Sequence, residues 1–358
     1  MIDAKHLQLV LAVETFGSLS KAAQSLNVTP SALSHQLKNL ESNLGLSIFH
    51  RIDNQLYFTE AGKEFKDRAK IILEEWQDLA NRMDAIKSDQ QARYIHGYSD
   101  REARRLVDQA TSVADFLHHD SIWEAGSRIL EIGCGVGAQT QIIAPQNPDC
   151  EFVSIDISSA SLKLAQEGIN QLRIQNVTLL ERDAFTIDPR IDGTFDHVFI
   201  CFLLEHVHQP KALLRQAKKM LKSGGTITVI EGDHGSTFFH PDHDAARQLV
   251  QAQVDLQQQK GGNANIGRML FPLLAATDYQ NIQVSPRQIY VDASMPHLVD
   301  GFIKNTFTAM IQGMSEELLQ AKLVDPITLQ AGIKGLLRTA ESDGVFSYTF
   351  FKGKGSTT

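Results

Sequence analysis

The sequence predicts an α/β fold for most of the chain, a doubly wound parallel sheet that follows a smaller all-α domain and a long helix. From Ile129 onward, short apolar runs alternate with helical stretches, which is typical of a parallel sheet with crossover helices. Up to about residue 58 the pattern is instead one of short helices separated by capping residues. Between the two regions, Thr59 to Lys87 is one amphipathic segment with no proline and a single glycine.

Length and composition limit the classes of protein that this chain can belong to. The 358 residues exceed one usual domain, and 42% hydrophobic with 21% charged residues excludes disorder over the whole chain. A net charge of −8 disfavours a protein that coats nucleic acid by bulk charge, although one local site could still bind it. Cys134, Cys150 and Cys201 are too scattered for a disulfide framework. With no apolar run of membrane-spanning length, we expect a soluble, cytoplasmic protein.

The N-terminal region has the pattern of two helices and a third that exposes a polar face. We expect helices over His6–Thr15 and from the Ser18 cap to Leu26, and Thr29-Pro30 is a strong start signal for the third. Two short strands, 49–51 and 56–58, would form a wing. This is the helix-turn-helix arrangement, although a packing domain without a ligand has the same pattern. The side chains that could donate to DNA phosphates or bases are Ser31, Ser34, His35, Lys38 and Arg51.

A family resemblance supports the DNA-binding interpretation. The stretch FGSLSKAAQSLNVTPSALSHQLKNLESNLGLSIFHR, followed by FTEAG, resembles the winged helix-turn-helix of LysR-type transcriptional regulators over roughly residues 1–90. The resemblance implies operator DNA as a partner. The wing departs from the family pattern, since Asp53-Asn54-Gln55 supplies fewer positive charges than usual, so we expect weaker non-specific affinity.

The long helix predicts dimerisation. Its apolar residues recur at spacings of 4 and 3, as in a coiled-coil seam: Phe65, Ala69, Ile72, Trp76, Leu79, Met83 and Ile86. LysR-type regulators dimerise through this helix, so the resemblance implies a homodimer. The alternative is that the same stripe packs on the protein's own second domain, and Trp76 is bulky for a regular two-stranded seam.

In the second region, polar and glycine residues follow each predicted strand. The strand Arg128–Ile132 leads into GCGVGAQT, where alternate glycines permit tight turns and close approach of a ligand. Asp156 ends the next strand, where a carboxylate can accept both ribose hydroxyls of a nucleoside. Further strands are predicted at 177–180, 197–202 and 226–231, and the C-terminal strand 346–351 is expected to pair with 282–291.

LEIGCGVG, Asp156, RDAF and KSGGTITVIEG occur in the order and spacing of class I S-adenosylmethionine (SAM)-dependent methyltransferases, which the chain resembles over roughly residues 94–353. The resemblance implies SAM as cofactor and S-adenosylhomocysteine (SAH) as product. It implies cofactor contacts at Tyr98, Glu131, Gly133, Gly135, Gly137, Thr140, Asp156, Ile157, Asp183, Ala184 and Leu203. Tyr98, or Tyr94 beside it, would lie near the sulfonium; a tyrosine that packs a domain junction is the alternative.

The domains predicted from these features are a winged helix-turn-helix at 1–58, a linker and dimerisation helix at 59–90, and a methyltransferase domain at 91–358 with a helical cap near 294–340. An acceptor with a proton to lose needs a base, and His206 and His234, just past the fourth and fifth strands, are the candidates. Glu205, Glu231 and Asp233 are the alternatives. No metal is expected, because the histidines and aspartates between 233 and 244 fit no ligand spacing and solvated loop residues explain them.

The sequence features are compatible with two functions. In the first, a DNA-binding regulator carries a working methyltransferase that acts on a small molecule. In the second, the same domain senses SAM or SAH without turnover. DNA itself is an unlikely methyl acceptor, since Cys201-Phe202-Leu203-Leu204-Glu205-His206 matches no motif of DNA base methyltransferases.

Overall fold

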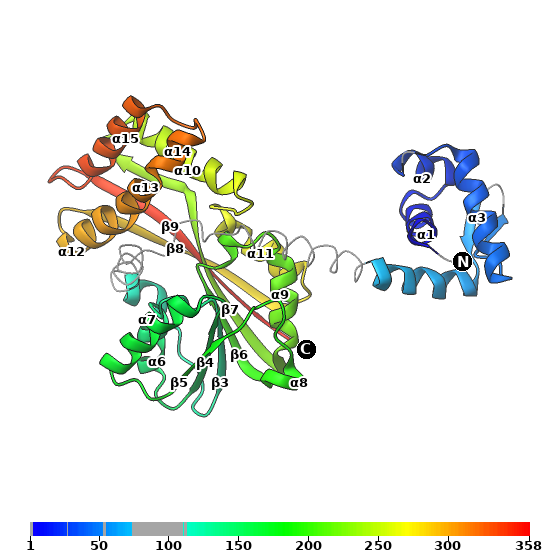
Figure 1. Ribbon diagram of the computed structural model, residues 1–358, viewed down its shortest axis with the longest axis horizontal. Helices are drawn as coiled ribbons and strands as arrows, with labels where there is room; N and C mark the ends of the chain where they lie inside the picture. The colour runs from blue at the N-terminus through cyan, green and yellow to red at the C-terminus, as the bar shows by residue number, and fades with distance from the viewer. Residues whose placement is uncertain (1–2, 27, 53–54, 74–109, 111–112) are drawn as a thin grey trace. The chain divides into compact units, whose positions relative to one another are not determined.

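The computed structural model describes residues 3–26, 28–52, 55–73, 110 and 113–358, in two compact units that span Met1–Ala92 and Arg93–Thr358. The first unit contains α1 (Ala4–Phe16), α2 (Leu19–Ser25), α3 (Pro30–Leu44), β1 (Phe49–Ile52) and β2 (Gln55–Phe58). A further helix begins at Glu60 and is described as far as Leu73 (Figure 1).

Local capping explains where the helices of the first unit begin. The Thr29 hydroxyl accepts a hydrogen bond from the Ala32 amide, and Pro30 occupies the first helical position, so the predicted start of α3 is confirmed. Ala22 and Ala23 are fully buried between the helices, where their small side chains allow close packing. The Glu41 carboxylate accepts the amides of Ile48 and Phe49 and so ties β1 to α3.

The Thr59-Glu60-Ala61-Gly62 motif has a direct structural reason. The Thr59 hydroxyl donates to the Ser47 carbonyl at 2.6 Å and accepts the Gly62 amide at 2.9 Å, which caps the helix and fixes it to the chain before β1. A Cβ at Gly62 would collide with the Ile48 carbonyl. The motif therefore sets the direction in which the long helix leaves the domain.

The second unit is built on a seven-stranded sheet with the order β5-β4-β3-β6-β7-β9-β8 (Figure 1). Its strands are β3 (Arg128–Ile132), β4 (Glu151–Asp156), β5 (Val177–Glu181), β6 (Phe195–Cys201), β7 (Leu221–His240), β8 (Gln280–Asp292) and β9 (Val345–Ser356). Neighbours from β5 to β7 are parallel, and β9 runs antiparallel to both β7 and β8. The predicted pairing of the C-terminal strand with 282–291 is confirmed.

Helices cover both faces of this sheet. They are α6 (Thr140–Gln146), α7 (Ser159–Gln171), α8 (Pro189–Asp192), η1 (Leu204–His206), α9 (Pro210–Lys219), α10 (Asp244–Gln259), η2 (Ile266–Met269), α11 (Leu270–Ala275), α12 (Pro296–Leu298), the π-helix η3 (Val299–Thr308), α13 (Ala309–Gly313), α14 (Ser315–Gln320) and α15 (Pro326–Arg338). Alternate strand residues enter different cores: Ile129 and Phe199 lie in one, Leu130 and Val198 in the other. Burial on both faces explains why these strands are apolar runs.

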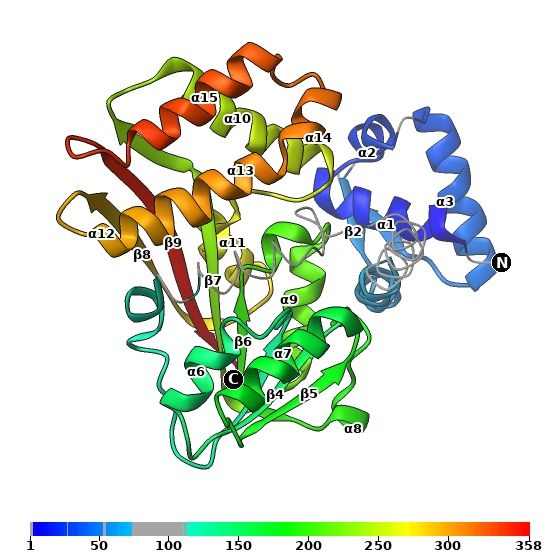
Figure 2. The same cartoon turned by 60° about the vertical axis from the view of Figure 1, so that its left-hand side comes forward.

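The last three strands are longer than the sequence predicts. The fifth strand was expected to end at Glu231, but β7 continues to His240, because β9 pairs with it again at Phe238–His240 after an irregularity. Figures 1 and 2 both show β7, β8 and β9 extending from the parallel sheet to the helices α10 and α12–α15. These helices share one hydrophobic core with that face of the sheet.

Among the described residues, no helix is long and apolar enough to cross a membrane.

Candidate functional site

Asp156 and the glycine loop meet at the carboxyl ends of β3 and β4. The Gly135 amide donates to Asp156 Oδ2 and the Ser158 amide to Oδ1, each at 2.8 Å. Burial raises the pKa of Asp156, and these two amides act against that shift. A carboxylate offers about four lone-pair positions, so the two amides leave acceptor capacity for two further hydroxyl groups.

The three loop glycines have different roles. All have positive φ angles, of 77° at Gly133, 53° at Gly135 and 73° at Gly137. A Cβ at Gly133 would press on Leu203, and one at Gly137 would come within 3.0 Å of Ala165, so these two permit internal packing. A Cβ at Gly135 would meet nothing within 4 Å. Gly135 is thus the glycine of this loop beside which a ligand can lie.

Glu131 and Thr140 bind each other beneath this loop. Both are buried, and Glu131 Oε2 accepts the hydroxyls of Thr140 and Ser154 at 2.6 Å each. Burial raises the pKa of Glu131, and the two hydroxyls act in the opposite direction. The pair joins the start of α6 to β4, so these polar groups are engaged inside the protein.

Four more of the predicted cofactor residues lie at the same edge of the sheet: Ile157, Asp183, Ala184 and Leu203. Ile157 is 52% exposed directly after Asp156, although it is a large apolar residue. Asp183 accepts the Phe185 amide at 2.9 Å, which folds the turn after β5, and Ala184 packs half-buried on the second core. Leu203 contacts the loop at Gly133. Register places Ile132, Ile155 and Ile200 side by side, so all three loops begin together.

The loop after β6 is strained and held by Glu231. Phe202 has φ of 55°, an uncommon conformation for a bulky residue. Glu231 is fully buried, and its Oε1 accepts the amides of Leu203 and Leu204 at 3.1 and 2.7 Å. Burial, followed by the nearby charge of Glu205, raises the pKa of Glu231 well above its usual value. Burial therefore favours the neutral form of Glu231, and its Oε1 positions this loop through the two amides.

The two predicted catalytic histidines face one carboxylate. His206 Nε2 lies 3.6 Å from Glu205 Oε1, and His234 Nε2 lies 3.7 Å from Oε2. Burial opposes the charge on Glu205, but His206, His234 and the amide of Gln257 outweigh it and hold its pKa below the usual range. Glu205 is thus an ionised group that orients the two imidazoles.

His234 does not lie in a solvated loop, as the sequence suggested, but in β7, where it is 5% exposed. Phe307 and Tyr348 both contact its ring, with centroids 6.0 and 5.4 Å away, and they contact each other at 5.7 Å. Asp233 is buried too and is held by Arg268 through three hydrogen bonds of 2.7–3.0 Å. That ion pair removes Asp233 from the list of candidate bases.

Sequence reasoning missed two glutamines of α10. Gln257 Nε2 donates to Glu205 Oε2 at 3.0 Å, and Gln253 Nε2 donates to Gln257 Oε1 at 2.9 Å. Both residues are at most 1% exposed on the face that also buries Leu249 and Leu256. The sequence signal that could have identified them is the position of two amide side chains on the side of a helix that faces the core.

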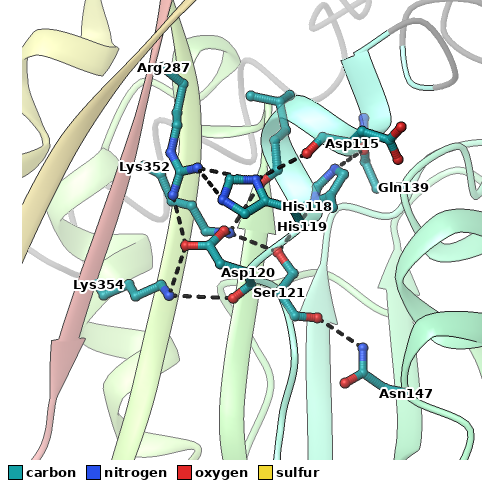
Figure 3. Close-up of polar contacts among 11 residues, drawn as sticks. Asp115, His118, His119, Asp120, Ser121, Gln139, Asn147, Arg287, Lys352 and Lys354 are labelled. Atoms are coloured by element: carbon teal, nitrogen blue, oxygen red, sulfur yellow. Dashed lines mark hydrogen bonds and ion pairs between the residues drawn. The ribbon is translucent and has the colours of Figure 1, made fainter.

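A second polar network lies between the cofactor loop and the segment before β3 (Figure 3). His118 Nε2 bonds Gln139 Oε1 of the loop at 2.7 Å, and burial lowers the pKa of His118 to about 4. Lys352 of β9 is 1% exposed, and its ammonium donates to the Leu117 carbonyl, Asp120 and Ser121 at 3.1, 2.6 and 2.8 Å.

The carboxylate of Asp120 is the centre of that network. Its second oxygen accepts from Arg287 at 2.7 Å and from Lys354 at 3.3 Å. Burial opposes its charge, but Lys352, Lys354 and Arg287 outweigh burial and hold the pKa of Asp120 below its usual range. The network thereby fixes residues 113–121 to β8, β9 and the cofactor loop.

In the first unit, α3 presents the predicted DNA-binding residues on one side. Ser31, His35 and Lys38 are exposed and Ser34 is half-buried, while Leu33, Leu37 and Leu40 are buried on the other side. The side chain of Arg51 lies outside the described residues, as do Tyr94 and Tyr98.

The linker seam is only partly as expected. Ala69 is fully buried and Phe65 packs against the core of the first unit, whereas Ile72 is 46% exposed. The first two seam positions therefore pack within their own domain, because the helix begins on that core. The four seam positions from Trp76 to Ile86 lie outside the described residues.

No group of three or more histidine, cysteine or carboxylate side chains that could hold a metal ion occurs in the described part of the chain. The three cysteines are free and buried.

Comparison with known families identifies the family of each unit. A model described as bacterial regulatory helix-turn-helix protein, lysR family, matches residues 4–63, and one described as methyltransferase domain matches residues 130–227. The chain joins a lysR-family helix-turn-helix to a methyltransferase domain. The predicted fold class is confirmed by the helical first unit and the mixed seven-stranded sheet of the second.

Relatives of each half are found separately. A demethylmenaquinone methyltransferase of Tropheryma whipplei is 30% identical over 41% of this chain and 66% of its own length. The transcriptional regulator AdmX of Serratia plymuthica is 34% identical over 26% of this chain and 31% of its own length. An uncharacterised Synechococcus protein is 28% identical, and the match covers 36% of that protein. The chain thus spans about a third to two thirds of these relatives.

Among solved structures, phosphoethanolamine N-methyltransferase 2 of Haemonchus contortus has a TM-score of 0.43 at 16% identity, over 70% of this chain and 56% of that one. The cyclase SpnF has a TM-score of 0.42 at 17% identity, over 70% and 81%.

Proposed function

We propose that the protein is a DNA-binding transcriptional regulator whose second domain is a SAM-dependent methyltransferase acting on a small molecule. The observation that carries the cofactor assignment is the pairing of Asp156 with the loop at Gly135. The carboxylate is held by two backbone amides, keeps lone pairs for two ribose hydroxyls, and lies beside a glycine with open space at its Cβ position. Glu131 and Thr140 support the loop from below.

The adenine end of the cofactor would lie between Ile157 and the turn of Asp183 and Ala184. An exposed Ile157 directly after the ribose carboxylate supports this, since an apolar side chain can cover a flat base. The Asp183 carboxylate, which gives one oxygen to the Phe185 amide, can accept an exocyclic amine with the other. Leu203, which packs against Gly133, would border the cofactor on the side of the glycine loop.

When bound, SAM supplies a methyl group on a positively charged sulfur, and an acceptor atom forms the new bond to carbon as the carbon–sulfur bond breaks, its electron pair staying on sulfur. The protein's part is to hold the acceptor and receive its proton. His234 is the proposed base. Its Nε2 faces the ionised Glu205, so Nε2 carries the hydrogen and Nδ1 keeps the lone pair. His206, at the same carboxylate, is the second candidate.

Calorimetry with SAM and SAH tests the cofactor assignment. Asp156→Ala removes a charged acceptor for two hydroxyls and should weaken binding by about 1.5–3 kcal/mol per lost bond. The matched control is Asp149→Ala, an exposed aspartate just before the same strand, which should bind like wild type. Equal affinities in both variants would show that the nucleoside does not lie on Asp156.

DNA binding is tested on fragments selected by the protein from random sequence. His35→Ala with Lys38→Ala removes two exposed side chains of α3 and should weaken binding while SAH affinity stays unchanged. Lys334→Ala, an exposed lysine of the second unit, is the control. Unchanged DNA affinity in the double variant would remove α3 as the reading helix. The exposed Ile72 supports a homodimer through the linker helix, which sedimentation of the full chain would detect.

A SAM or SAH sensor is the second candidate, and the network of Figure 3 favours it as an additional role. His118 connects the cofactor loop at Gln139 to residues 113–121. If cofactor binding moves this contact, DNA affinity should change by roughly 5- to 150-fold at fixed salt. Identical DNA titrations with and without saturating SAH would mean that the cofactor does not regulate DNA binding.

A further inference from the structure

The methyltransferase unit has buried polar atoms without a hydrogen-bond partner among the described residues. Besides His243 Nδ1 and Arg287 Nε, they include four atoms: Glu231 Oε2, His234 Nδ1, Gln253 Oε1 and Thr308 Oγ1. The side chains of these four residues are between 0% and 5% exposed. An unsatisfied buried polar group costs about 1–3 kcal/mol, and native proteins contain few of them. Several in one region therefore indicate groups that a ligand satisfies.

The contacts of Glu231, His234 and Gln253 bring these three residues to one place. Glu205 is the common neighbour: His234 faces it, Gln257 links it to Gln253, and Glu231 binds the amides that precede it. Thr308 follows Phe307, whose ring lies beside that of His234. Three of the atoms thus come from β7 and α10, where these elements meet the loop after β6, and the fourth comes from the adjoining helix η3. We call the four atoms the acceptor group.

The geometry of η3 is a second indication. Residues 299–308 form a π-helix, in which the Thr306 hydroxyl donates to the Gly301 carbonyl at 2.7 Å. π-Helical turns are rare and occur frequently at functional sites. This one places Phe307 against His234 and Thr308 directly beside it in sequence.

Each atom of the acceptor group requires a definite kind of partner. His234 Nδ1 has a lone pair, because Nε2 faces the carboxylate of Glu205. Gln253 Oε1 is an acceptor, because the amide nitrogen donates to Gln257. Glu231 Oε2 belongs to a carboxyl group whose other oxygen accepts two amides and whose pKa is raised by burial, which favours the protonated form that donates. Thr308 can donate or accept. The ligand must therefore offer both donors and acceptors.

The charges around the group disfavour an ionic ligand. Among the described neighbours, the cation is Arg268, which Asp233 neutralises, and the anion is Glu205, which Gln257 and two imidazoles hold. Neither a carboxylate nor a phosphate would find a counter-charge here. A histidine base is best matched to a hydroxyl far more acidic than that of an aliphatic alcohol, such as a phenol with a pKa of about 10.

We infer that the acceptor group recognises an uncharged methyl acceptor bearing an acidic hydroxyl, a phenol or an enol, whose proton passes to His234 Nδ1. This inference rests on the proposed function. Gln253, Gln257 and Glu205 are positioning residues: they act on the ligand or on His234 through hydrogen bonds and do not exchange the proton. Phe307 and Tyr348 pack against the imidazole and against each other, which restricts its orientation.

Calorimetry on the full chain saturated with SAH tests the inference with three aromatic probes: catechol, benzylamine and benzoate. Catechol should bind at least tenfold more tightly than the other two. Gln253→Leu should weaken catechol binding about tenfold, the factor expected for one hydrogen bond of 1–1.5 kcal/mol. Gln251→Leu, on the exposed side of the same helix, should bind catechol like wild type.

The proton role is tested by SAH release with catechol as acceptor. His234→Gln should lower kcat by 10²- to 10⁴-fold, as expected for a lost general base, with a smaller change in KM. A preference for benzylamine or benzoate, no binding of catechol, or an unchanged kcat would overturn the inference. SAH affinity is measured in every variant to separate these outcomes. If the wild-type protein does not bind SAH, the proposed function is wrong. If it binds SAH but does not prefer catechol, only the inference about the methyl acceptor is wrong.

Discussion

Two polar networks are buried in the methyltransferase unit, and they differ in how fully their members are satisfied. Around Asp120, the Lys352 ammonium has a partner for each of its three hydrogens and both carboxylate oxygens are engaged, although Arg287 Nε has no partner among the described residues. Around Glu205, by contrast, the chain through Gln257 and Gln253 ends at acceptors with no partner among the described residues. A satisfied network fixes the fold, whereas an unsatisfied one is prepared for a ligand. The two should respond oppositely to mutation.

The largest expected effect is on stability, from Asp120→Ala. The substitution leaves the 1% exposed Lys352 ammonium without its carboxylate, and an uncompensated buried charge costs about 3–5 kcal/mol of unfolding free energy. Urea unfolding of the second unit measures the loss. The double variant Asp120→Asn with Lys352→Met removes both charges and should regain most of it. A double variant as unstable as Asp120→Ala would mean that shape, and not charge, makes this network important.

A smaller effect is expected from pH at His118. Its folded pKa of about 4 lies below the ordinary 6.5, so the unfolded chain binds more protons between these values. Stability should therefore be complete above pH 6.5 and fall by about 3 kcal/mol as pH drops to 4. Unfolding titrations at pH 7.5, 5.5 and 4.5 give the slope. In His118→Gln the unfolding free energy should depend less on pH over this range. An unchanged pH dependence would show that other groups cause it.

The smallest stability change is expected in the unsatisfied network. Gln253→Leu removes one unpartnered carbonyl but leaves Gln257 Oε1 without its donor, and adds apolar contact on a buried helix face. The unfolding free energy should stay within about 1 kcal/mol of wild type. A loss comparable to that of Asp120→Ala would place Gln253 among the structural residues and erase the contrast between the networks.

The cofactor side was readable from sequence because its parts are local. Gly135 and Asp156 each follow a strand directly, and parallel strands bring their ends to one edge whatever the rest of the fold does. The network around Glu205 was not readable from sequence. Gln257 and its partner Glu205 are 52 residues apart, and a helical pattern shows which face is buried but not which polar group it meets.

His234 illustrates the same limit. Its residue type and place after a predicted strand marked it as a candidate, but its burial depends on β9, more than a hundred residues later, which continues to pair along β7. The exposed face of α3 was predicted well, because the start at Thr29-Pro30 and the leucine spacing fix which side of one helix is exposed, and its role in DNA binding stays a prediction. Phe65 and Ala69 of the predicted seam pack within their own unit, because the leading turns of a helix can belong to the domain in which it begins, and the dimerisation seam stays a prediction.

The length of β7 has a consequence for exchanging substrate specificity between relatives. The twenty residues of this strand belong both to the parallel sheet and to the part that carries the cap helices. A graft confined to residues 294–340 would place foreign helices on strands that kept their original side chains, among them His234 and Tyr348. The segment to transfer therefore runs from Glu231 to Phe350. Both junctions of such a graft lie within the β7–β9 pair, so the graft must also keep the register of that pair, Glu231 with Phe351 and Gly232 with Phe350.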